Sequence, residues 1–403
     1  MMRSMFAGVT GLRNHQVRMD VIGNNIANVN TVAYKASRAD FQEAFSQTLR
    51  GSSSPSGERG GTNPQQVGLG MTLSSIDVIH TQGSPQMTGG LTDLAIEGGG
   101  FFLLSGAGRL VYTRAGNFHL DASGYLTGGG GMRLQGWMAV DGEFTAKDEG
   151  TLTSIQIPAG VTVGARATDA MAFGQNLGSS SNVGDSFVKT VDVFDSLGTT
   201  HSVVVTFRKT GVNSWSWDAR VQGVAAGSGT LGFGSNGQLG TGGTGTVAFT
   251  PTGANPVSIT VNFGKVTQYF AETTVAASER NGHQMGSLQT FTVDATGVIT
   301  GVYSNGLNRK LAQVALANFT NPGGLIRSGE NNFAESNNSG LRQIGIPGTG
   351  GRGMVAPNSL EMSNVDLSLE FTNMILTQRG FQANSRIIGA TDEMLQELVN
   401  LKR

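Results

Sequence analysis

The chain has 403 residues, a formal net charge of −1 and no cysteine. The lack of cysteine excludes disulfides, thiolate metal ligands and a cysteine nucleophile, and the balanced charge argues against a nucleic-acid-binding protein, which normally has a basic face. Only 14% of the residues are charged and 61 are glycine, whereas an average soluble protein has about 25% charged residues, so we expect a β-rich body with many turns.

The first predicted element is a helix that ends near residues 28–31. Apolar residues recur at helical spacing, and one row of them has a spacing of seven residues, which is typical of a helix packed along a coiled-coil-like seam. Internal glycines each cost up to about 1 kcal/mol of helix propensity, so the helix needs a partner. The apolar residues that we expect to take part in self-association are Met5, Val9, Leu12, Met19, Ile22, Ile26 and Val29.

Residues 36–75 are expected to form a linker or an extended arm. Within them, residues 50–64 contain no apolar side chain and are rich in serine, glycine and proline. Such a segment cannot contribute to a core, and its composition favours an irregular path.

Short runs of β-branched and aromatic residues dominate from about residue 67 to residue 360, for example at 257–263. The sequence Asp-x-x-Gly recurs between such runs. Because aspartate starts a turn and glycine accepts a positive φ angle, we predict hairpin loops at these places. They are residues 121–124, 195–198 and 294–297.

The last predicted element is a second helix, in which apolar residues again recur every seven positions. Ser363 or Asn364 is the expected N-cap, with Asp366 in the first turn. The residues that we expect to take part in self-association here are Leu367, Phe371, Met374, Phe381, Ile388, Leu395 and Leu398.

The alternative for the two terminal helices is a hairpin within one chain that merely closes a domain. Polar residues interrupt both apolar stripes, at Gln16 in the first helix and at Gln378 and Ser385 in the second. The residues between the helices are of β type and offer no obvious sheet face for the helices to cover. Both observations favour self-association.

The sequence predicts no catalytic, cofactor-binding or metal site. The pattern G-x-G-x-x-G occurs four times, but no copy opens a predicted helix, as a dinucleotide site requires. The five histidines are scattered without H-E-x-x-H spacing, and no carboxylate pair of the glycosidase kind stands out. Trp215 and Trp217 share one face of a strand, and we interpret them as core residues rather than as a sugar-stacking surface.

The N-terminal residues do not have the pattern of a Sec signal peptide, because no continuous apolar core precedes a small-residue cleavage site. No stretch approaches 18 uninterrupted apolar residues, so we expect no transmembrane helix. An extracellular location would therefore require another export route.

Residues 20–35, Asp-Val-Ile-Gly-Asn-Asn-Ile-Ala-Asn-Val-Asn-Thr-Val-Ala-Tyr-Lys, resemble the flagellar axial-protein family of rod and hook proteins. Residues 98–136, 316–340 and 360–403 resemble further blocks of that family. Ala33 departs from the pattern, because the family usually has glycine before the aromatic residue, and alanine adopts a positive φ angle poorly. The residues that carry the family motif are Asp20, Gly23, Asn24, Asn25, Asn28, Asn30, Thr31, Tyr34, Lys35, Gln378 and Arg379.

The resemblance implies an α+β multidomain fold. The paired N- and C-terminal helices would form a coiled-coil-like inner domain, followed by two mainly-β domains, the outer one inserted into the inner one. The expected boundaries are 1–35 and 364–403 for the helical polymerisation domain, 36–75 for the arm, 76–148 and 276–363 for the inner β domain, and 149–275 for the outer β domain.

The function implied by the resemblance is that of a structural, non-enzymatic subunit of the flagellar hook. It would polymerise into a curved, flexible tube, a universal joint that joins rod to filament and transmits torque. The implied partners are other copies of the chain, the distal rod protein, the hook-filament junction proteins, the hook cap and the flagellar type III export apparatus, with no nucleic acid, small-molecule substrate or cofactor. Export would proceed without a cleaved signal peptide, to the hook outside the cell.

Three alternatives to the hook subunit remain. A distal rod protein belongs to the same family, but the outer domain and the sequence of residues 363–367 favour the hook. An extracellular adhesin and a peptidoglycan-cutting enzyme are more remote. Electron microscopy separates hook from rod, and a binding screen and a zymogram separate the other two.

Overall fold

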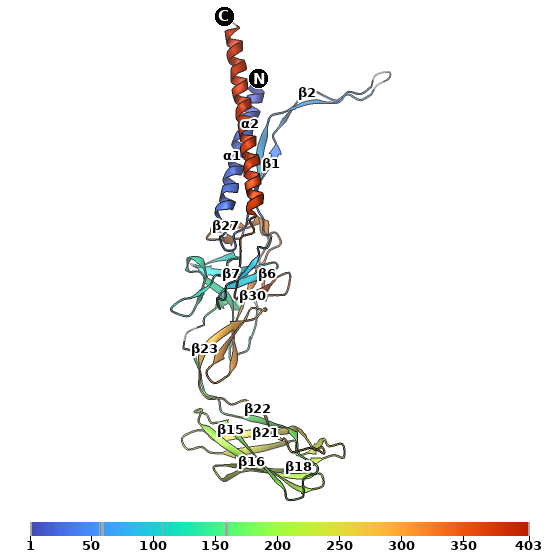
Figure 1. Cartoon of the computed structure of the whole chain (residues 1–403), viewed down its shortest axis with the longest axis vertical. Helices are drawn as coiled ribbons and strands as arrows, with labels where there is room; N and C mark the ends of the chain where they lie inside the picture. Colours follow the sequence, from blue (N-terminus) through green and yellow to red (C-terminus); the bar gives the residue numbers. More distant parts are fainter. Residues whose placement is uncertain (1, 56, 58–59, 107, 158–159, 402–403) are drawn as a thin grey trace. The chain divides into compact units, whose positions relative to one another are not determined.

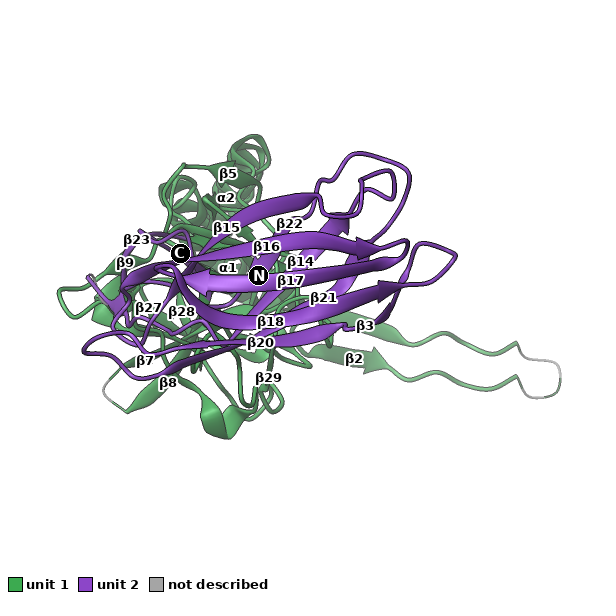
Figure 2. Cartoon of the chain, turned by 90° about the horizontal axis from the view of Figure 1, so that it is seen from below, with its two compact units in different colours: residues 1–158, 292–300, 310–403 green, residues 159–291, 301–309 purple. Residues whose placement is uncertain are grey.

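The computed structural model describes residues 2–55, 57, 60–106, 108–157 and 160–401. The chain forms two compact units, shown in different colours in Figure 2. Unit 1 comprises residues 1–158, 292–300 and 310–403, and unit 2 comprises residues 159–291 and 301–309.

Unit 1 begins with helix α1 (Met2–Ala27) and ends with helix α2 (Leu367–Asn400). The two helices lie side by side in Figure 1. The predicted N- and C-terminal helices are therefore confirmed as elements of the fold.

Two antiparallel strand pairs follow α1, in the segment where the sequence suggested only a linker or an extended arm. β1 (Ser37–Glu43) pairs with β4 (Met71–Val78), and β2 (Ser46–Arg50) pairs with β3 (Gln65–Gly68). Pairing continues toward the tip as a bridge between Ser53 and Thr62. The polar composition did not prevent strand formation, because in a two-stranded ribbon the backbone hydrogen bonds do not require a buried face.

The β body of unit 1 is a mixed set of short strands in which five are ordered β11-β7-β8-β28-β27. Its core consists of residues from both halves of the chain: Phe101, Leu103, Tyr112, Trp137, Ala315, Ala317, Phe319, Leu325 and Phe333. The strands are β5 (Pro85–Met87), β6 (Leu94–Glu97), β7 (Phe101–Gly106), β8 (Arg109–Thr113), β9 (His119–Leu120), β10 (Leu126–Thr127), β11 (Arg133–Met138), β12 (Thr153–Ser154), β26 (Leu316–Asn318), β27 (Ile326–Gly329), β28 (Asn332–Ala334), β29 (Gln343–Gly345), β30 (Met354–Pro357) and β31 (Ser359–Glu361).

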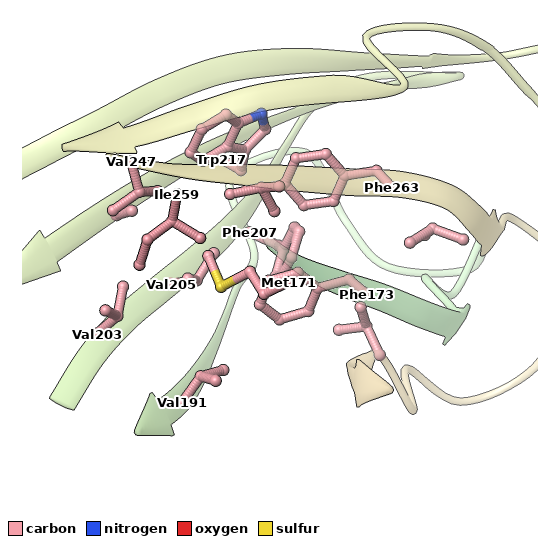
Figure 3. Close-up of a cluster of buried hydrophobic side chains, with 14 of the residues drawn as sticks. Met171, Phe173, Val191, Val203, Val205, Phe207, Trp217, Val247, Ile259 and Phe263 are labelled. Atoms are coloured by element: carbon pink, nitrogen blue, oxygen red, sulfur yellow. The ribbon is translucent and has the colours of Figure 1, made fainter. Parts of the chain in front are cut away.

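Unit 2 is a two-sheet β structure around one apolar core. One sheet has the order β15-β16-β17-β18-β19 and the other β20-β21-β14-β22. Figure 3 shows aromatic and β-branched side chains from both sheets in contact. The strands are β14 (Ala170–Asn176), β15 (Ser186–Phe194), β16 (Thr200–Gly211), β17 (Ser214–Val221), β18 (Val224–Phe233), β19 (Leu239–Thr241), β20 (Thr244–Phe249), β21 (Val257–Thr267) and β22 (Ala276–Arg280).

The predictions for the β region hold at particular residues. Trp215 and Trp217 are buried in the core of unit 2. The Asp195 carboxylate accepts hydrogen bonds from the backbone N–H groups of Leu197 and Thr199, and Gly198 has a φ angle of 84° in the turn between β15 and β16. The remaining strands are β13 (Thr162–Val163), β23 (Gly286–Val293), β24 (Val298–Tyr303) and β25 (Asn308–Val314).

Within the described residues, no helix is both long and apolar enough to span a membrane. The same residues contain no group of three or more histidine, aspartate or glutamate side chains placed to hold a metal ion.

Candidate assembly site: the terminal helices and their junction with the β body

Helices α1 and α2 are antiparallel. Near the C-terminal end of α1, the Asn25 side-chain amide donates to Glu370, at the start of α2. Near the N-terminal end of α1, Gly8 lies opposite Ile388. Burial raises the pKa of Glu370 above its usual value, although the hydrogen bond from Asn25 acts in the opposite direction.

The predicted self-association residues divide into two groups. Ile22 is buried, and most of the others are half-buried: Met5, Val9, Leu12, Met19, Ile26, Val29, Met374, Phe381, Ile388 and Leu395. Leu367, Phe371 and Leu398 are exposed. Most residues of the two apolar rows are therefore partly shielded from solvent within a single chain, as expected for the alternative, a helical hairpin within one chain.

Close contact between the helices depends on glycines, which sequence reasoning treated only as weak points. A Cβ atom at Gly11 would lie 2.5 Å from Nδ2 of Asn384, and one at Gly380 would lie 2.7 Å from Nε2 of His15. Gly8 and Gly11 therefore allow α2 to approach, which offsets their low helix propensity. A Cβ atom at Gly23 would have no neighbour within 4 Å, so this glycine remains a weak point.

The outward face of α2 carries apolar side chains that sequence reasoning missed. Leu376 is 61% exposed and Leu369 is 58% exposed, and the two are seven residues apart. A second row of the same spacing was therefore available in the sequence beside the first one. Monomeric proteins rarely expose large contiguous apolar patches unless these are interaction sites, so the exposed row on α2 is a candidate interaction surface. The exposed apolar residues outside the predicted set are Leu369, Ile375, Leu376, Ile387, Met394, Val399 and Leu401.

The N-cap of α2 is Asp366, and neither Ser363 nor Asn364. The Asp366 carboxylate accepts hydrogen bonds from the N–H groups of Ser368, at 2.8 Å, and Leu369, at 3.1 Å. Asn364 is used elsewhere, because its side chain accepts from the N–H of Ala36 and donates to the carbonyl of Ile79. The prediction failed because Asn364 is held by these tertiary contacts, and the Ser363 hydroxyl accepts the N–H of Val365, which precedes the helix.

Six family-motif residues gather at the end of α1. The Tyr34 hydroxyl lies 3.0 Å from Oδ1 of Asn24 and 3.1 Å from Oδ1 of Asn25. Asn25 also accepts from the N–H of Ser37 and donates to its carbonyl oxygen, which joins the helix to β1. Asn28 and Thr31 hydrogen-bond within the turn, and Lys35 is buried. The other motif residues are exposed: Asp20, Gly23, Asn30, Gln378 and Arg379.

Ala33 adopts the backbone conformation that its position demands, with a φ angle of 58°, and is almost completely buried. Its N–H donates to the carbonyl of Glu361. The backbone strain expected for alanine at this position is therefore present, because an L-residue in the left-handed conformation raises the free energy of the folded state by about 1–2 kcal/mol.

We predict that Ala33→Gly changes the free energy of unfolding by less than about 1 kcal/mol, because relief of backbone strain is offset by a more flexible unfolded chain and a lost methyl group. Ala33→Val should cost about 2–5 kcal/mol, because a β-branched residue fits neither this backbone conformation nor the space. Urea unfolding of unit 1 measures both. Equal stability of the two variants would contradict the observed turn.

His80 lies in the β body near the junction, with its ring 5.7 Å from that of Phe101 and 5.2 Å from that of Phe333. Burial, together with the nearby positive charges of Lys35, Arg114 and Arg327, lowers the pKa of His80 to about 4. The neutral imidazole is therefore the form that fits the folded protein.

We predict that unit 1 loses stability as the pH falls from about 6.5 through 4. An unfolded histidine binds its proton near pH 6.5, so the unfolded state gains protons first, and the loss approaches about 3 kcal/mol. His80→Gln should remove most of this dependence, whereas replacement of the exposed His119 should not. Urea titrations between pH 4 and 7.5 test this; an unchanged slope in His80→Gln would refute it.

Comparison with known proteins gives four matches to family models. Residues 5–35 match the flagella basal body rod protein family, residues 95–170 the D1 domain of flagellar hook protein FlgE/F/G, residues 184–283 the D2 domain of flagellar basal body protein FlaE, and residues 356–401 the C-terminal region of flagellar basal body rod FlgEFG proteins. The match over residues 184–283 includes most of the expected outer β domain, residues 149–275.

Proteins that match this chain over its whole length are described as flagellar hook or rod proteins. The chain is 42% identical to flagellar hook protein FlgE of Borreliella burgdorferi and 39% identical to that of Treponema pallidum, in each case over 100% of both chains. It is 32% identical to flagellar basal-body rod protein FlgG of Bacillus subtilis, again over 100% of both. The crystal structure of Helicobacter pylori hook protein FlgE2 is similar in fold, with a TM-score of 0.56 at 14% identity, covering 69% of this chain and 100% of that one.

Proposed function

This chain belongs to the flagellar hook protein family and is a structural subunit of the hook, and from that premise we propose that the outward face of α2 is a principal surface through which copies assemble. The observation that carries the proposal is the row of exposed apolar residues on α2 that includes Leu369, Leu376 and Met394. Burial of one such side chain contributes about 1.5–3 kcal/mol, and a polymer repeats that gain in every subunit.

The half-buried residues of the helix seam have a supporting role in this proposal. Residues such as Phe381 and Leu395 hold α2 against α1, so that the outward face is presented in one orientation. Self-association then depends on both groups of residues, with the seam acting within the chain and the exposed face acting between chains.

We further propose that the polymer contacts the distal rod protein at one end and the hook-filament junction proteins at the other, and that the hook cap and the type III export apparatus handle the chain during growth. Family membership supports these assignments. The same membership supports a purely mechanical role without catalysis.

We also propose that the chain is organised into a helical domain, an arm, an inner β domain and an inserted outer β domain. The support for this organisation is the separate core of unit 2. The outer domain would begin near residue 149 and end near residue 275.

A rod subunit is the alternative that the experiment has to exclude, because the chain is also 32% identical over its full length to a protein described as a rod protein. Electron microscopy of the purified, polymerised protein separates the two. A hook subunit should give curved tubes, and a rod subunit should give straight, rigid ones. Protein that stays monomeric at high concentration and in precipitating salt would count against both.

A further inference from the structure

Three buried charged side chains meet where the terminal helices join the β body. Lys35 follows α1, Glu361 ends β31 just before α2, and Arg114 follows β8 of the body. The side chains of Lys35, Glu361 and Arg114 are 0%, 1% and 5% exposed. We call these residues the junction cluster.

Glu361 connects the other members of the junction cluster. One carboxylate oxygen lies 2.5 Å from Nζ of Lys35 and accepts the N–H of Gly83 at 2.8 Å. The other lies 3.4 Å from Nη1 of Arg114. A single carboxylate, on the segment that leads into α2, therefore binds both the segment that leaves α1 and the β body.

The cations of the cluster are also fixed by backbone carbonyl groups of the body. Lys35 donates to the carbonyl of Thr81 at 2.8 Å, and Arg114 donates to that of Gly98 at 2.8 Å. Such bonds have narrow geometric requirements, whereas apolar packing tolerates small rotations. A buried ionic network of this kind can therefore specify an orientation even where it adds little net stability.

We propose that the junction cluster is a rigid joint that fixes the direction of the terminal helices relative to the β body, and thereby sets the shape of the assembled tube. This inference rests on the proposed assembly through the helices. If subunits contact one another through α2, any freedom at the joint becomes disorder in the positions of the β bodies along the tube. Torque applied to the helices would reach the bodies through this joint.

Loss of the junction cluster can change both the stability of the junction and the orientation of the helices. Two variants distinguish these effects. Glu361→Gln leaves Lys35 buried without a counter-ion, which should open the junction on the order of a hundredfold more often. The triple variant Lys35→Met/Arg114→Met/Glu361→Met replaces all three buried charges with apolar side chains, which commonly restores stability. Only the triple variant leaves no buried charge unpaired and therefore tests orientation alone.

The experiment measures a distance distribution in the polymer. Because the chain has no cysteine, Ser123→Cys in the β body and Ser385→Cys on α2 accept spin labels selectively. Both sites are exposed. Labelled subunits are diluted into unlabelled ones of the same variant, and electron-electron dipolar spectroscopy gives the distances between the two labels of one subunit.

We expect one narrow distance peak in the otherwise native chain and a distribution at least twice as wide in both variants, with tubes of irregular curvature. Glu279→Gln is the matched control, because it breaks an ion pair with Lys265 in which both side chains are 66% exposed; it should leave the peak narrow. A narrow peak in either junction variant would overturn the proposal. Failure of the native chain to form tubes would instead overturn the proposed function.

Discussion

Glutamate in place of Leu376 is expected to abolish polymerisation and to leave the monomer folded. Leu376 is 61% exposed in the single chain, so the new carboxylate stays in water there. In the polymer it would be buried against another subunit, and the effective penalty for burying an unpaired ion is several kcal/mol. Each subunit incurs that penalty, and so the critical concentration for assembly should rise at least a thousandfold.

Sedimentation and negative-stain microscopy measure the loss of polymer, and circular dichroism follows the fold of the monomer. Gln382→Glu is the matched control, because it adds the same charge at an exposed polar position of α2. Normal tube yield from Leu376→Glu, with Gln382→Glu also normal, would show that this face of α2 lies outside the interface.

The double variant Phe381→Ala/Leu395→Ala is expected to lose both polymerisation and the pairing of the two helices. Fully buried Phe→Ala and Leu→Ala changes cost about 3–5 and 2–5 kcal/mol, and these half-buried side chains should approach the lower limits. The β body should stay folded, because its core lies elsewhere.

Tube yield by sedimentation measures the loss of polymerisation, and hydrogen exchange in any residual polymer measures the pairing of the two helices. Leu197→Ala is a suitable control for the leucine change, since it removes the same atoms as Leu395→Ala from an exposed turn of unit 2. If the double variant polymerises as well as the control variant, the seam between α1 and α2 is not needed for assembly.

Sequence reasoning succeeded where the signal is local. Seven-residue spacing located both helices, and the Asp-x-x-Gly pattern located turns such as that at Asp195, because one side chain closes the turn on its own backbone. The alternation of Trp215 and Trp217 placed both on one face of a strand, and that face is the core.

Sequence reasoning failed where the outcome depends on a distant partner. Nothing near Gly11 indicates that Asn384 will lie against it. Lys35 and Glu361 are far apart in the chain, yet they form a buried ion pair. Which face of α2 is exposed also depends on which side α1 covers. Two apolar rows of the same spacing therefore could not be assigned to the inner or the outer face of α2 without the fold.

The most direct test of assembly through the terminal helices compares hydrogen exchange in the monomer and in the tube. α1 has 26 residues and α2 has 34, and isolated helices of such composition are marginal in water, because their stability comes mainly from packing. Ordering costs about 1–2 kcal/mol per residue, which the contacts within one chain offset only in part.

We therefore expect residues 2–30 and 365–401 to exchange with little protection in the monomer and to become strongly protected in the tube, while the core strands of both units are protected in each state. The largest change should occur around Leu376. Equal protection of both helices in monomer and tube, or a tube in which α2 still exchanges freely, would contradict assembly through these helices.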